Sequence, residues 1–183
     1  VGAKQRSQPV GKGYARVYSG KDGAILYTFA GAAIEDGFGY SVADAGDVND
    51  DGYADVIVGA RNALSGSIRP GRARVFSGKD GTVLHTFFGD ADGDSFGQSV
   101  SGAGDVDADG HADVVVGAPW ADRNGSRSGF ARVYSGRTGA TLHTFAGDSG
   151  GDLLGLSVHS AGDVNKDGRA DLIVGAPGHG KNG

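Results

Sequence analysis

The chain has 183 residues, and glycine occupies 36 of them, about a fifth and nearly three times the ordinary share. It has no cysteine, which excludes a disulfide scaffold and a zinc–cysteine site. It also has no apolar run approaching the roughly 20 residues of a membrane helix, and its formal net charge of −5 argues against a general nucleic-acid binder. We therefore expect neither membrane insertion nor nucleic-acid binding.

The first predicted elements are two short strands joined by a tight turn. In ARVYSG, which begins at Ala15, Val17 alternates with polar neighbours as in a half-buried strand, and the second strand covers Ile25–Phe29. Asp22 and Gly23 lie between them, and an Asp-Gly pair is a hairpin signal because glycine tolerates positive φ. These strands fall within residues 14–30.

Two further strands are predicted around an acidic loop. The segment FGYSV, from Phe38, reads as a strand that leads through small residues into DVNDDGYADVIVGA, from Asp47. The second strand is Ala54–Ala60, a short apolar run that suits a strand buried on both faces. No window of the chain shows a sustained helical period, so we predict an all-β fold.

These segments recur with a period of 58 residues. Phased copies of several blocks indicate a tandem array, which is the first thing to establish in such a chain. The acidic segment returns as DVDADGHADVVVGA at Asp105 and DVNKDGRADLIVGA at Asp163. ARVYSG returns as ARVFSG at Ala73 and unchanged at Ala131, and FGYSV returns as FGQSV at Phe96 and LGLSV at Leu154.

Units of four short strands and this length predict the blades of a β-propeller. A parallel β-helix has much shorter coils, and a sandwich does not repeat its sequence. We expect a single domain, residues 1–183, with three blade-equivalents of four antiparallel strands each. The predicted parts are an N-terminal half-blade at 1–30, complete blades at 38–88 and 96–146, and a C-terminal half-blade at 154–177.

The two half-blades predict self-association. Three blades are fewer than the four to eight that usually close a ring, and an open array leaves strand edges unpaired. We expect the C-terminal half-blade of one chain to pair with the N-terminal half-blade of another, so that a homodimer closes a six-bladed ring. The alternative is that the chain is a piece of a longer one.

Each acidic loop carries oxygen ligands at alternate positions. Aspartates stand at positions 1, 5 and 9, Asn or Asp at position 3, and a glycine at the sharp turn of position 6. Hard oxygen donors of this number suit Ca²⁺, which accepts six to eight at loose geometry. The predicted side-chain ligands are Asp47, Asn49, Asp51 and Asp55, then Asp105, Asp107, Asp109 and Asp113, then Asp163, Asn165, Asp167 and Asp171.

The residues at position 7, namely Tyr53, His111 and Arg169, would add only their backbone carbonyls. An EF-hand is excluded because its position 12 is a bidentate glutamate, whereas position 12 here is a valine inside a strand. Turns merely rich in Asp and Gly are the alternative, but three copies of the full pattern argue against it. We expect about three Ca²⁺ ions per chain, held most tightly by the second loop with its four carboxylates.

With these motifs in order, the chain resembles the FG-GAP repeat family, which forms the blades of the integrin α-chain propeller and of many bacterial extracellular proteins. The resemblance implies that each acidic loop joins the first and second strands of a blade and binds Ca²⁺. Leu154 replaces the Phe of the FG motif, and Arg61 replaces the Pro of GAP, which Pro119 and Pro177 keep. Integrin propellers have seven blades, so the number of blades stays open.

Outside the loops, candidate ligand-binding residues are Trp120, Arg123 and Arg127, in a variable connection after a second strand. Tryptophan there would stack on a sugar or anchor a protein, or else pack on the neighbouring blade. The acidic cluster around Asp94 is expected to be a solvated turn rather than an ion site. We find no nucleophile–base–acid set, so the chain is predicted to be no enzyme.

The predicted function is a calcium-binding propeller that serves as a structural or adhesion-type interaction scaffold. Partners would be a second copy and a protein or glycan ligand. The alternatives are a propeller lectin that holds sugar between blades, and an accessory piece of a larger extracellular enzyme. Calcium sites with dissociation constants of about 10⁻⁴ to 10⁻³ M need a calcium-rich compartment, so we expect an extracellular or periplasmic location.

Overall fold

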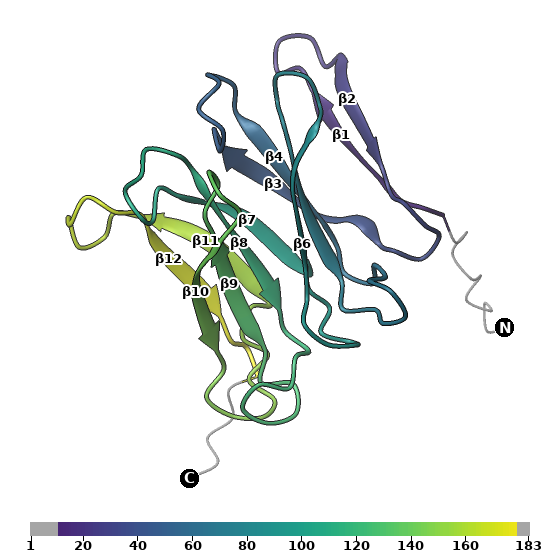
Figure 1. Cartoon of the computed structure of the whole chain (residues 1–183), viewed down its shortest axis with the longest axis vertical. Coiled ribbons are helices and arrows are strands. Elements are labelled where there is room, and N and C mark those ends of the chain that lie inside the picture. The colour runs from purple at the N-terminus through teal and green to yellow at the C-terminus, as the bar shows by residue number, and fades with distance from the viewer. Residues whose placement is uncertain (1–10, 179–183) are drawn as a thin grey trace, which may run out of the picture.

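The computed structural model describes residues 11–178, and these form twelve strands in four antiparallel sheets (Figure 1). The all-β prediction is confirmed. Residues 1–10 of the predicted N-terminal half-blade lie outside the described residues. The strands are β1 (Tyr14–Tyr18), β2 (Ile25–Ala30), β3 (Phe38–Gly46), β4 (Asp55–Ala60), β5 (Arg72–Phe76), β6 (Val83–Phe88), β7 (Ser99–Gly104), β8 (Asp113–Ala118), β9 (Phe130–Tyr134), β10 (Thr141–Ala146), β11 (Ser157–Gly162) and β12 (Asp171–Gly175).

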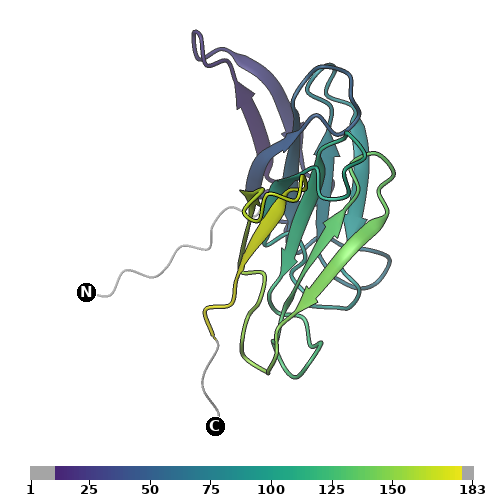
Figure 2. The ribbon, with the colours of Figure 1, turned by 90° about the vertical axis from the view of Figure 1, so that its left-hand side faces the viewer.

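Two of the sheets are complete four-strand meanders, and two have only two strands. The orders are β3-β4-β5-β6 and β7-β8-β9-β10 for the complete sheets, with β1-β2 and β11-β12 as two-stranded sheets. The sheets follow one another in a row, with β1-β2 and β11-β12 at opposite ends (Figures 1 and 2). This arrangement is consistent with consecutive propeller blades.

The second strand of each complete sheet is buried on both faces because it lies between two paired strands and between two sheets. All six residues of β8 are buried, including Val114, Val115 and Val116. Burial of both faces explains why the segment is a continuous apolar run rather than an alternating one. The third-to-fourth strand turns are closed by a glycine at positive φ, for example Gly81 at 77°.

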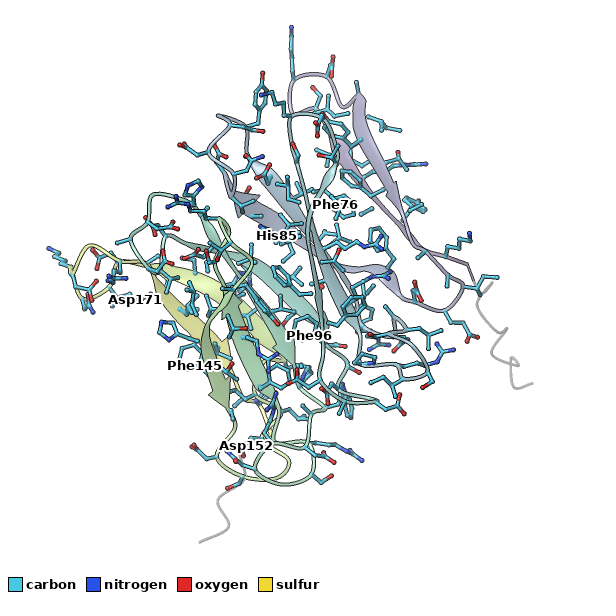
Figure 3. All side chains as sticks on the ribbon, viewed as in Figure 1. Phe76, His85, Phe96, Phe145, Asp152 and Asp171 are labelled. Carbon is cyan, nitrogen blue, oxygen red and sulfur yellow. The ribbon has the colours of Figure 1, made fainter. Side chains whose placement is uncertain are left out.

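Neighbouring sheets pack through aromatic side chains that repeat at the same spacing. Phe29 on β2 stacks on Phe76 of β5 with ring centroids 4.1 Å apart, and Phe87 on β6 stacks on Tyr134 with centroids 4.0 Å apart. His85 on β6 reaches the turn of the next sheet, where its Nε2 lies 2.5 Å from the carbonyl oxygen of Gly136 (Figure 3). The fourth strand of one sheet therefore packs against the third strand of the next sheet and against the turn that follows it.

Candidate metal centre

The three acidic loops join β3 to β4, β7 to β8 and β11 to β12, and all three have the same internal hydrogen bonds. In the second loop, both oxygens of Asp105 accept backbone N–H groups, from Asp109 at 3.1 Å and Gly110 at 2.9 Å. Asp107 Oδ1 accepts the N–H of Asp109 at 3.2 Å, and Asp109 Oδ1 accepts the N–H of His111 at 3.0 Å. These bonds curl the loop so that positions 1, 3 and 5 face one another.

Backbone conformation supports this curl. Gly110, at position 6, has a φ of 88°, and no atom lies within 4 Å of the place where a Cβ would be. Glycine is thus favoured at this position by the positive φ of the backbone and not by a lack of space for a side chain. The preceding position 4 is also left-handed, with Ala108 at 61° and its counterparts Asp50 at 57° and Lys166 at 62°.

The carboxylates of the second loop converge. Asp105, Asp107 and Asp109 each place an oxygen within 4.8 Å of the other two, and all three are half-buried. Within residues 11–178, no lysine or arginine forms an ion pair with them. Like charges held this close without a cationic side chain repel one another, so the donor set fits a hard divalent cation such as Ca²⁺.

The first and third loops have asparagine at position 3, so each offers one carboxylate less. Their hydrogen bonds match those of the second loop: Asn49 Oδ1 accepts the N–H of Asp51 at 3.2 Å, and Asn165 Oδ1 accepts that of Asp167 at 2.9 Å. The predicted ligands Asp47 and Asp163 hold the position-1 place by accepting the N–H of the loop glycine. The three loops therefore share these backbone hydrogen bonds but differ in charge.

The aspartate at position 9 links its loop to another turn of the same sheet. Asp113 is fully buried, and its two oxygens accept the N–H of Val106 at 2.7 Å and of Gly136 at 3.0 Å. Asp55 does the same with Val48 and Gly78, both at 2.9 Å. Burial raises the pKa of both carboxyls, and these hydrogen bonds work against that rise. Position 9 thus ties the loop to the third-to-fourth strand turn of its own sheet, a contact that spacing alone did not reveal.

Position 7 also does more than offer a carbonyl. The ring Nδ1 of His111 lies 3.2 Å from the carbonyl oxygen of Val48, and Arg169 Nη1 donates to that of Val106 at 2.9 Å. The backbone adds a parallel link, because the N–H of Ala112 donates to the carbonyl of Asp47 at 3.1 Å. Neighbouring loops are thus bonded to each other. The remaining position-7 residue, Tyr53, is exposed.

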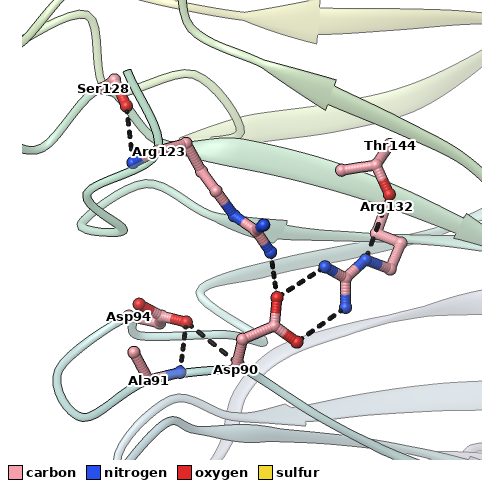
Figure 4. Close-up of polar contacts among 7 residues, drawn as sticks. All are labelled: Asp90, Ala91, Asp94, Arg123, Ser128, Arg132 and Thr144. Atoms are coloured by element: carbon pink, nitrogen blue, oxygen red, sulfur yellow. Dashed lines mark hydrogen bonds and ion pairs between the residues drawn. The ribbon is translucent and has the colours of Figure 1, made fainter. Parts of the chain in front are cut away.

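Ion pairs and a cation–π contact organise the region of Trp120, Arg123 and Arg127. Arg127 lies over the Trp120 ring, with Cζ 5.4 Å from its centroid. Arg123 and Arg132 both pair with Asp90, and Arg132 does so through two hydrogen bonds of 3.0 and 2.7 Å (Figure 4). A cavity of about 280 Å³ is lined by Trp120, Arg123 and Asp90 among others.

The acidic cluster expected to be a solvated turn consists of Asp90, Asp92 and Asp94, and the expectation is wrong for Asp94 alone, because Asp90 and Asp92 are exposed. Asp94 is 4% exposed, and its Oδ2 accepts the N–H groups of Asp90 at 3.0 Å and Ala91 at 2.9 Å (Figure 4). Asp36 and Asp152, one repeat away on either side, are equally buried. Each of these three buried aspartates caps the loop that leads into a first strand, so they form a repeated structural element.

Comparison with known proteins agrees with the repeats seen in the structure. The FG-GAP repeat family matches residues 38–83, 96–134 and 155–183. The chain belongs to the FG-GAP repeat family. It is 34% identical to integrin alpha-PS5 of Drosophila melanogaster over 180 residues and 32% identical to integrin alpha-V of Gallus gallus over 184, covering 92% and 91% of this chain. It spans only 18% and 17% of the length of those relatives.

Integrin alpha-5 of Xenopus laevis is similar too, at 31% identity over 91% of this chain and 17% of its own length. The expected family is therefore confirmed. Among the described residues, no helix is long and apolar enough to cross a bilayer.

Proposed function

We propose that this FG-GAP chain is a non-catalytic calcium-binding propeller module that acts as a structural and interaction scaffold outside the cell or in the periplasm. The observation that carries the proposal is the convergence of Asp105, Asp107 and Asp109 within 4.8 Å, without a cationic partner among the described residues. The same loop geometry in the other two repeats supports about three Ca²⁺ ions per chain. Similarity to integrin alpha chains favours an adhesion-type role.

In this proposal, the side chains at positions 1, 3 and 5 and the carbonyl at position 7 would hold the ion, with position 9 as a further oxygen donor. When bound, Ca²⁺ supplies positive charge that neutralises the loop carboxylates. The protein contributes preformed loops, because backbone N–H groups already orient Asp105 and its counterparts Asp47 and Asp163. Calcium would thus stabilise the fold without chemistry of its own.

Thermal unfolding in calcium, magnesium and chelator tests this function. At a free calcium concentration of about 100 times the dissociation constant, each occupied site adds about 2.7 kcal/mol to the free energy of unfolding. Magnesium should add less because the loops do not impose a tight octahedron. Calorimetric titration should count about three calcium ions per chain. A melting temperature that is the same in calcium and in chelator would refute the structural role of the metal.

The same proposal includes two copies closing a six-bladed ring. The support is that β1 and β12 each have one unpaired edge among the described residues and lie at opposite ends of the row of sheets (Figure 1). Light scattering of the 183-residue chain in calcium should give twice the chain mass, and a monomer would contradict ring closure.

A glycan ligand is the second candidate for the interaction surface. Trp120 is 40% exposed, and an exposed tryptophan ring beside Arg127 offers a stacking face for a sugar or an anchor for a protein. A glycan array probed with the parent and with Trp120→Ala distinguishes the two. Binding lost in the variant supports the sugar ligand, and an array with no parent binding leaves a protein ligand.

A further inference from the structure

Several side chains are buried between sheets in two copies of the repeat and exposed in the third. Phe29 and Phe87 are buried, but their counterpart Phe145 is 41% exposed. Phe76 and Tyr134 are buried, whereas Tyr18 at the equivalent position is 55% exposed. The exposed copies lie on β10 and β1, at the two ends of the row. Because burial elsewhere comes from the adjacent sheet, these ends display two halves of one interface.

The hydrogen bonds of the position-9 aspartates show the same difference between the inner copies and the end copy. Asp55 and Asp113 each accept one N–H from their own loop and one from the turn after a third strand, at Gly78 and Gly136. Asp171 accepts the loop N–H of Val164 at 2.8 Å, and the equivalent turn glycine, Gly20, lies at the other end of the row. Phe145 and Asp171 occupy the same end of the molecule (Figure 3).

The inner side of the interface shows a matching gap. A Cβ on Gly46 would lie 2.5 Å from that of Ala112, and one on Gly104 would lie 2.6 Å from that of Ala170. These glycines are needed because an alanine of the next loop occupies the space. The third copy, Gly162, has no atom within 4 Å of its Cβ position among the described residues.

Apolar hollows mark the same two ends. One of about 450 Å³ lies beside β10 and β12 and is lined by Phe145, Leu172 and Val174. The other, of about 320 Å³, lies beside β1 and is lined by residues that include Val17 and Val42. Each end thus offers what the other lacks.

We propose a defined seam between two copies of this chain, in which β12 of one copy pairs antiparallel with β1 of the other. This rests on the two-copy ring proposed above and specifies how it closes. The register follows from the two equivalent pairs of second and third strands inside the chain. In β4–β5, Ile57 faces Val75, and in β8–β9, Val115 faces Val133. Moving one repeat further places Ile173 opposite Val17, with Leu172 opposite Tyr18 and Val174 opposite Arg16.

The same mapping assigns the contacts around the strand pair. Phe145 stacks on Tyr18 of the second copy, as Phe87 stacks on Tyr134. The other oxygen of Asp171, for which no partner is found within residues 11–178, accepts the N–H of Gly20 of the second copy. Ala54 of that copy lies against Gly162. A twofold axis produces two such seams, so a dimer leaves neither β1 nor β12 with a free edge. A slip of one residue would turn Ile173 away from the core face.

Disulfide trapping tests the register, and the chain has no cysteine of its own to interfere. Directly opposite residues have Cα atoms about 4.5 to 5.5 Å apart, which a disulfide spans. The double variant Ile173→Cys/Val17→Cys, oxidised in calcium, should migrate as a covalent dimer of twice the chain mass in denaturing, non-reducing gels. The matched control Ile173→Cys/Ala15→Cys shifts one cysteine by two residues, beyond disulfide reach, and should stay monomeric.

Native mass measured on the same samples separates the two proposals. A native dimer that cross-links through the control pair, or through neither pair, overturns the register while two-copy association stands. A native monomer in calcium overturns both. A covalent monomer with an internal disulfide, or a ladder of larger species, overturns the closed dimer. Calcium dependence of the melt is measured independently, so its outcome does not decide this one.

Discussion

Replacing the buried aspartate of the second loop separates its structural role from metal binding. In Asp113→Asn, one of the two oxygens that accept the N–H groups of Val106 and Gly136 becomes an N–H₂ donor. One hydrogen bond to a charged acceptor is lost, and two donors face each other in a fully buried site. The expected loss is about 3 kcal/mol in chelator, and it is larger in calcium because the proposed site also loses its carboxylate at position 9. For a chain of this size it corresponds to a fall of about 6 to 12 °C in melting temperature.

The matched control is Asp107→Asn, because the other two loops carry Asn49 and Asn165 at that position with the same hydrogen bonds. This control should lower the calcium affinity of the second loop, because it removes one of three converging carboxylates. In chelator it should cause no loss of stability, because no ion is present to need that carboxylate. Urea unfolding and calcium titration of both variants measure the two effects. A chelator-treated Asp113→Asn as stable as the parent would refute the structural role.

Two smaller changes probe buried and half-buried ion pairs. Arg72 contacts Asp36 at 3.2 Å while its own Nε is buried without a hydrogen-bond partner among the described residues, and the next repeat buries Phe130 at the same place. We expect Arg72→Phe to change the free energy of urea unfolding by about 1 kcal/mol or less, because the next repeat buries Asp94, the counterpart of Asp36, with Phe130 in the place of the arginine. This is below the cost that removal of one partner of a buried ion pair usually has. Hydrogen bonds from Arg132 hold the pKa of Asp90 below its ordinary 3.8, so Asp90 stabilises the fold above that pH and loses its effect as pH falls through the lowered pKa. Asp90→Asn should therefore cost about 1 kcal/mol in urea unfolding at pH 6 and less at pH 3, since the carboxylate is partly exposed.

The strands were predictable because their signals are local and repeated. Alternation in ARVYSG, the Asp-Gly turn and the apolar run of Ala54–Ala60 each lie within a few residues, and the common period sets their phase. The structure begins β4 at Asp55 and extends β2 to Ala30, which are shifts of one residue. Such ends depend on pairing with the neighbouring strand, which local sequence does not specify.

The missed features are contacts between segments distant in sequence. Asp113 is a plausible metal ligand by spacing, but its bond to Gly136 joins residues 23 positions apart. His111 reaches Val48 across 63 positions, into the preceding repeat. Asp36, Asp94 and Asp152 share the 58-residue period, so their recurrence was visible in the sequence even though their burial was not. Conserved phase would have been the signal for a structural role.

The third loop connects calcium binding to association. Asp171 stands at position 9 of that loop and also at one end of the row of sheets. Among the described residues, only one of its oxygens accepts a backbone N–H, that of Val164, whereas both oxygens of buried Asp113 do so. In the proposed seam, Gly20 of a second copy supplies the other N–H and fixes the carboxylate, as Gly136 fixes Asp113. The same orientation of the Asp171 carboxylate then serves calcium binding and binding of the second copy. By linkage, each binding event must raise the affinity for the other. Three of the four sheets carry an acidic loop, and in the proposed seam the third of these loops lies at the joint between the two chains.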